Sequence, residues 1–110
     1  MANRTITITG INSDGTLILS DGGTTTANAG DTVTWVVGDN SGVASITGII
    51  DDSEIDVFSP DPVPVSSTSW QGTIKTTPPT SMETEEYTIN YLKIGDAVIH
   101  SFDPKIQVNS

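Results

Sequence analysis

The most distinctive chemistry in this sequence is an acidic segment near its middle. Residues 51–61 carry five carboxylates, Asp51, Asp52, Glu54, Asp56 and Asp61, together with Pro60. Hard oxygen ligands crowded in a loop are what Ca²⁺ requires, at about 6 to 8 per ion. The spacing lacks the alternate ligand positions around a fixed glycine that mark the helix-flanked calcium loop. We therefore interpret the segment as a solvated acidic loop, with a calcium site formed by Asp51, Asp52, Glu54 and Asp56 as the alternative.

Three residues near the C-terminus have the types found in hydrolytic triads. His100 and Ser101 are adjacent and Asp103 follows, but adjacent side chains of an extended segment point to opposite faces. Glycoside hydrolysis needs two carboxylates at a defined separation, and no pair stands out among the 14 acidic residues. We therefore expect no catalytic residues.

Composition excludes several partners and sites. The formal net charge is −10, with 4 basic residues, whereas nucleic acids and anionic membranes require clustered Lys and Arg. No segment approaches the roughly 18 consecutive apolar residues of a membrane span, and no signal peptide precedes the first strand-like pattern. Cysteine is absent, so disulfides, thiolate metal sites and cysteine nucleophiles are excluded, and cysteine usage indicates no compartment.

The element around which the chain is organised spans residues 29–37. Its alternation sends Val33, Trp35 and Val37 to one face, as expected of a buried central strand that follows the Gly30-Asp31 turn. A second core strand is predicted at 85–94, with Tyr87, Ile89 and Tyr91 on one face. Further strands are expected at 4–9, 16–20, 24–26, 43–50, 70–76, 97–99 and 105–109.

Regular alternation stops between residues 51 and 69. We interpret this stretch as a long irregular connection, the most mobile part of the chain, whose middle is pinned to the core by Ile55, Val57 and Phe58. In the 43–50 strand, Ala44, Ile46 and Ile50 share a register, with Gly48 as a bulge. The 17 threonines favour strand over helix. The sequence thus predicts a single domain over residues 1–110, an all-β two-sheet Greek-key sandwich of seven or eight strands.

Residues 29–35, Ala-Gly-Asp-Thr-Val-Thr-Trp, resemble a characteristic strand of the cupredoxins, the blue-copper sandwiches. Residues 86–91 are similar to the penultimate strand of that family and 106–108 to its last strand, so the resemblance covers about residues 24–109. It implies a cupredoxin-like fold; another immunoglobulin-like sandwich is the alternative. The copper site does not carry over, because Tyr91 stands where the resemblance puts a cysteine, Ser45 or Ile46 where it puts a histidine, and His100 is the single histidine.

These observations predict a non-enzymatic β-sandwich module with a structural or binding role and no cofactor. Its partner would be a protein or a small ligand, without nucleic-acid binding or membrane insertion. The alternative is a calcium-dependent interaction domain of a surface or secreted protein that uses the acidic loop 51–61. An acid–base enzyme is the third hypothesis.

Overall fold

The computed structural model describes residues 3–51, 57–59, 61–77 and 79–109, and for Asp51 the backbone only. The described residues form ten strands: β1 (Asn3–Ile11), β2 (Leu17–Leu19), β3 (Thr24–Ala27), β4 (Thr32–Val37), β5 (Val43–Asp51), β6 (Val63–Ser66), β7 (Ser69–Thr73), β8 (Glu83–Lys93), β9 (Ile99–Phe102) and β10 (Lys105–Val108). No helix in this part of the chain is long and apolar enough to cross a membrane.

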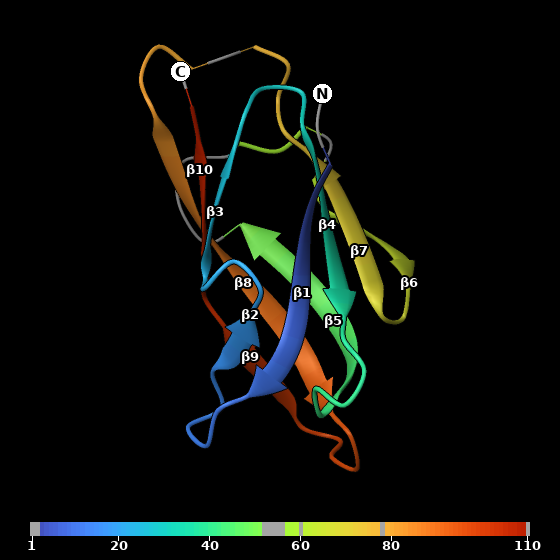
Figure 1. The fold of residues 1–110 in the computed structure, drawn as a ribbon. Helices are drawn as coiled ribbons and strands as arrows, with labels where there is room; N and C mark the ends of the chain where they lie inside the picture. Colours follow the sequence, from blue (N-terminus) through green and yellow to red (C-terminus); the bar gives the residue numbers. More distant parts are fainter. Residues whose placement is uncertain (1–2, 52–56, 60, 78, 110) are drawn as a thin grey trace.

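The strands form two mixed sheets (Figure 1). The first has the order β2-β1-β4-β7-β6, with β1 and β4 parallel. The second has the order β3-β10-β8-β5, with β3 and β10 parallel, and β9 also pairs with β8. The all-β prediction is confirmed.

One hydrophobic core joins the two sheets. Trp35 on β4 and Tyr87 on β8 are both fully buried, and their ring centroids lie 5.5 Å apart although the strands belong to different sheets. As expected for the organising strand, β4 is the central strand of its sheet, and Val33 and Trp35 point into the core. The core therefore forms where β4 faces β8.

The predicted alternation holds along β8 but is wrong along β5. On β8 the buried side chains include Tyr87, Ile89 and Tyr91. On β5 the buried residues are Val43, Ile46 and Ile49, whereas Ala44 and Ile50 are exposed. The pairing of β5 with β8 shifts at two places, between Val43 and Ser45 and between Ile46 and Gly48. Each bulge inserts an extra residue, which moves the following side chains to the opposite face.

The interpretation of 51–69 as one irregular connection is wrong for its described part. Phe58 forms a bridge with Ile74, and β6 pairs with β7. Val57 and Phe58 are buried, which confirms that they pin the segment to the core; Ile55 lies outside the described residues. Because β6 is fully exposed and short, it lacks the buried alternation by which strands are recognised. The chain consequently has ten strands in its described part rather than seven or eight.

Candidate functional site

A cavity forms where the chain leaves the second sheet for the first. β5 ends opposite Tyr87, since Asp51 is its last residue paired with β8, while β8 extends further back to Glu83. The chain at 57–59 already belongs to the first sheet: Lys75 donates its N–H to the Val57 carbonyl at 2.9 Å, and Ser59 donates to the Thr73 carbonyl at 2.8 Å. Near Glu85, β8 thus lies beyond the end of β5, and the Val57 N–H contacts the Glu85 carboxylate there.

This cavity has a volume of about 320 Å³, at the small end of the range for ligand sites. Its apolar lining consists of Ile49, Ile50, Phe58 and Pro62. Its polar lining consists of Asp61, Glu85 and Tyr87. Ile50 and Asp61 are exposed at its mouth, whereas Glu85 and Tyr87 form a covered floor. Among the described residues, the cavity thus has apolar walls and the carboxylates of Asp61 and Glu85.

Glu85 is the unusual residue of this site. It occupies a core position on β8, in phase with Tyr87, and its side chain is 0% exposed. Its Oε1 accepts the N–H of Val57 at 2.9 Å, so a carboxylate of the second sheet holds the crossover segment that pairs with the first. Burial of a carboxylate carries a desolvation cost, and such positions are candidates for function as well as for structure.

Aromatic rings connect the cavity to the centre of the core. The Trp35 ring packs on both Phe58 and Tyr87, with centroid distances of 5.7 and 5.5 Å. The Trp35 indole Nε1 donates to the Tyr87 hydroxyl at 3.1 Å in a buried hydrogen bond. Burial raises the pKa of Tyr87 well above its usual value of 10.0, against the smaller lowering effect of the Trp35 bond. Tyr87 consequently stays neutral at physiological pH. Because the Trp35 indole bonds to Tyr87, we expect its N–H signal to respond to changes at the cavity floor.

Two positions that the cupredoxin resemblance gives to copper ligands, Tyr91 and Ile46, pair with each other near the other end of β8. Ile46 and His100 are both register partners of Tyr91, on β5 and β9, whereas Ser45 pairs with Leu92. The rings of Tyr91 and His100 are 5.6 Å apart. The Tyr91 hydroxyl donates to the carbonyl of Gly15 in the β1–β2 turn. At this end a phenol bridges the two sheets.

The polar groups of this end have local partners. His100 Nε2 lies 3.0 Å from Asp96 Oδ2, and Val98 donates its N–H to Asp96 Oδ1 at 2.8 Å. The hydrogen bond from His100, followed by that from Val98, lowers the pKa of Asp96 below its usual value of 3.8. This arrangement resembles a turn stabilised by its own side chains more than a reactive centre.

The triad-like residues do not converge. His100 pairs with Asp96, Ser101 donates its hydroxyl to Asn90 Oδ1 at 2.7 Å, and Asp103 Oδ1 accepts from the Thr88 hydroxyl at 2.7 Å. Each side chain is engaged with a different partner on β8 or in the preceding turn. A nucleophile–base contact between His100 and Ser101 is therefore missing from this geometry.

Most of the candidate calcium ligands fall outside the described residues. This applies to Asp52, Glu54 and Asp56, and for Asp51 the structure describes a strand end without its side chain. Among the residues that are described, no group of three or more His, Asp or Glu side chains could hold a metal ion. Asp61, the last acid of the predicted loop, lines the cavity beside Glu85.

Sequence reasoning missed Glu85 as a site residue although a signal was present. Glu85 lies two, four and six positions before Tyr87, Ile89 and Tyr91, so the alternation of side chains along a strand places its carboxylate on the same, buried face. The role of Tyr87 had no such signal, because its partner Trp35 lies 52 positions away in the sequence.

No protein-family model matches the chain, and no curated protein matches it. Among solved structures, the chain is similar to the inclusion body protein PixA from Burkholderia cenocepacia J2315, with a TM-score of 0.44 and 20% sequence identity. That similarity covers 97% of this chain and 77% of the other. Agreement at this level is too low to establish a shared topology or function.

Proposed function

We propose that the protein is a non-enzymatic binding module on a Greek-key β-sandwich of cupredoxin-like topology without copper, and that the cavity beside Glu85 is its ligand site. The cavity carries this proposal: it combines about 320 Å³ of space with a buried carboxylate on its floor. Apolar walls with a few convergent polar groups are the usual composition of small-molecule sites.

The cupredoxin-like part of the proposal rests on strand pairing and on register. β1 pairs in parallel with β4, and β3 with β10, so each sheet contains both parallel and antiparallel pairs. A meander of consecutive hairpins would contain antiparallel pairs alone. Tyr91 and Ile46, two positions that the resemblance gives to copper ligands, are also register partners. The non-enzymatic part rests on the engagement of Glu85 Oε1 by Val57 and of the Tyr87 hydroxyl by Trp35.

A fragment screen followed by nuclear magnetic resonance tests the site. A fragment bound in the cavity should shift the indole N–H signal of Trp35, because that group bonds to Tyr87 on the cavity floor. The amide of Gly95, in the turn beyond the opposite end of β8, should not move. Fragments that shift Gly95 and leave Trp35 unmoved would contradict the proposed location.

Gly72 on β7 offers a test of the cavity's shape. A Cβ atom at Gly72 would lie 3.0 Å from Phe58 Cδ1 and 3.1 Å from Pro62 Cγ, so Gly72→Ala should push these two side chains toward the cavity that they line. Fragment binding should weaken. Gly48→Ala is the matched control, since its Cβ would meet Asn90 only at an ordinary 3.7 Å.

The calcium-dependent alternative has one observation in its favour, because Asp61 and Glu85 line the same cavity. Ca²⁺ bound at this place should raise the melting temperature of the parent protein and shift the Trp35 indole signal.

A further inference from the structure

Two strands at the margins of the sandwich need protection against pairing with other chains. β5 and β6 each end a sheet, and an edge strand exposes backbone N–H and C=O groups that can pair with another chain. Natural proteins protect such edges with short strands, charges, prolines or covering segments. β5 has nine residues, whereas β6 has four, all of them exposed. The two strands are protected in different ways.

The β6–β7 hairpin covers the edge of β5. Ile46 on β5 donates its N–H to the Ser67 carbonyl at 3.2 Å, and its own carbonyl accepts the Trp70 indole Nε1–H at 3.2 Å. Both backbone groups of Ile46 are thus bonded to the hairpin. β6 remains as the outermost strand on this side of the molecule (Figure 1), and among the described residues no strand pairs with its free edge.

Hydrogen bonds on both sides of β7 define which way its backbone groups point. The Ile74 N–H, one residue beyond β7, donates to the Asp31 carbonyl beside β4 at 2.8 Å, whereas the Thr73 carbonyl accepts the Ser59 N–H at 2.8 Å on the opposite side. Successive residues of an antiparallel pair direct their N–H and C=O groups alternately toward the partner and away from it. Gln71, two positions before Thr73, therefore directs its groups toward β6.

Pro64 faces the free edge of β6. Val63 pairs with Gln71, and Pro64 pairs with Trp70. Because Gln71 directs its groups toward β6, Val63 and Gln71 form a hydrogen-bonded pair, and the next pair, Pro64 with Trp70, is a non-hydrogen-bonded one. The nitrogen and the carbonyl of Pro64 consequently point away from β7. Proline has no N–H, so this position offers the free edge an acceptor and no donor.

The adjoining positions give the edge the same character. Pro62 lies two positions before Pro64, so the alternation turns it toward the free edge as well. The ladder shifts between Pro64 and Ser66, and such a bulge bends the edge away from regular pairing. Addition of a strand requires N–H and C=O groups from both partners. Two prolines at the outward positions do not meet this requirement.

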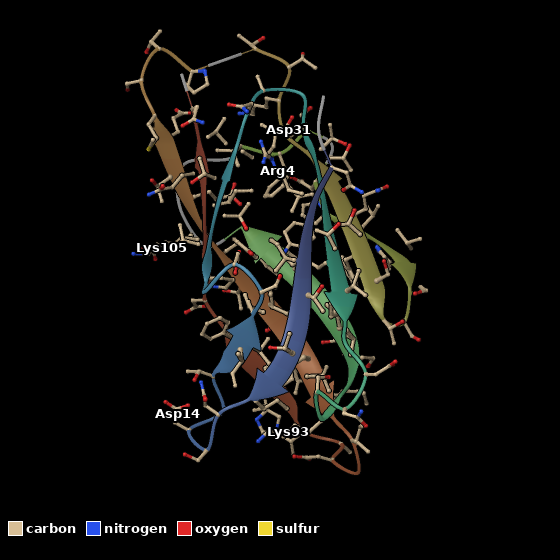
Figure 2. All side chains as sticks on the ribbon, in the orientation of Figure 1. Arg4, Asp14, Asp31, Lys93 and Lys105 are labelled. Atoms are coloured by element: carbon tan, nitrogen blue, oxygen red, sulfur yellow. The ribbon has the colours of Figure 1, made fainter. Side chains whose placement is uncertain are left out.

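Charge does not protect this edge. β6 has the sequence Val-Pro-Val-Ser, without a charged residue, and Val63 and Val65 are 53% and 64% exposed. In Figure 2, Lys93 lies at the lower end of the molecule and Lys105 on the side opposite the place of β6 in Figure 1. An exposed apolar edge strand is a site of association unless its backbone is blocked.

We propose that Pro62 and Pro64 make the free edge of β6 a surface of carbonyl oxygens that excludes strand addition, and that they prevent a second copy of this chain from pairing with β6. Pro64 is not among the residues that line the cavity. A change at Pro64 therefore tests this inference independently of the proposed ligand site.

Pro64→Val adds an N–H to the free edge and keeps an apolar side chain suited to a strand. Position 64 can then pair with position 64 of a second copy across a two-fold axis, through two N–H···O=C bonds. Sedimentation velocity at about 0.15 M salt, where the Debye length is about 8 Å, measures self-association with the repulsion between the acidic chains screened. Pro64→Val should self-associate at least about tenfold more tightly than the parent, as expected for two added hydrogen bonds. Pro79→Val, the same substitution in the connection between β7 and β8, is the matched control and should behave like the parent.

Two further measurements identify the surface that associates. The new amide at position 64 should exchange with solvent more slowly at high than at low protein concentration, because it is bonded only in the dimer. Val65→Lys added to Pro64→Val should restore the behaviour of the parent, since a charged side chain on an edge opposes pairing. Association of Pro64→Val that is no tighter than that of the parent up to about millimolar protein would overturn the proposal. A dimer in which the amide at position 64 stays unprotected would also overturn it, because the contact would lie elsewhere.

Discussion

Replacement of Tyr87 by phenylalanine removes one oxygen from the centre of the core. The Trp35 indole N–H then loses its 3.1 Å acceptor, and both residues are 0% exposed, so water cannot substitute for it. A buried donor left unsatisfied costs about 1 to 3 kcal/mol. At neutral pH, Tyr87→Phe should therefore lower the free energy of unfolding by about this amount in urea melts.

The same variant makes a prediction about alkaline pH. Because burial raises the pKa of Tyr87 in the folded state above its ordinary 10.0, the tyrosine ionises first in the unfolded state. A group with a raised folded pKa contributes stability below its unfolded pKa and loses it as pH rises further, by about 1.4 kcal/mol per pH unit. Between about pH 9 and pH 11.5 the parent should lose about 2 kcal/mol through this residue. The phenylalanine variant lacks this loss, so the difference between the two proteins should shrink by the same amount.

Tyr91→Phe is the control for loss of a hydroxyl. Tyr91 donates to the Gly15 carbonyl at a partly exposed turn, where water can replace the phenol, so its cost at neutral pH should be below that of Tyr87→Phe. Only Tyr87→Phe should shift the Trp35 indole signal. A stability difference between parent and Tyr87→Phe that stays constant from pH 9 to pH 11.5 would refute the burial of the phenol.

Three further predictions concern Trp35 in the core, Asp96 in the turn before β9, and the response to copper. Trp35→Ala should cost about 3 to 5 kcal/mol, because its ring packs on both Phe58 and Tyr87; urea melts that match the parent would mean that β4 is not the core strand. Hydrogen bonds from His100 and Val98 lower the pKa of Asp96 in the folded state, so the stability that Asp96 contributes is present above its ordinary pKa of 3.8 and is lost on acidification. In thermal melts, the stability advantage of the parent over Asp96→Asn should therefore narrow between about pH 5 and pH 2. A difference that stays constant over this range would contradict the contact between Asp96 and His100. Cu²⁺ should produce no intense absorption near 600 nm, because the chain has no cysteine to form the copper thiolate, and such a band would disprove this.

Local pattern in the sequence determined the strands that have one buried face. The alternation at β4 and β8 predicts which side chains enter the core because the side-chain period of a strand is two whatever its neighbours are. Gly30 and Asp31 likewise mark the turn before β4: Gly30 has a φ of 82°, and Asp31 Oδ2 accepts the Asn28 N–H at 2.9 Å. The absence of cysteine and the single histidine exclude a blue-copper site without reference to any fold.

Other features were decided only by the tertiary structure, because they depend on which strands become neighbours. The two bulges of β5 arise in its pairing with β8 and reverse the faces of Ala44 and Ile50. β6 exists as an edge partner of β7, and its exposed residues carry no periodic signal. The cavity depends most clearly on tertiary structure. The alternation of side chains along β8 places Glu85 in the core, but the recess beside it exists because β5 ends opposite Tyr87 and the chain continues into the other sheet. Contacts between residues far apart in the sequence, such as Trp35 with Tyr87, leave no trace in local alternation.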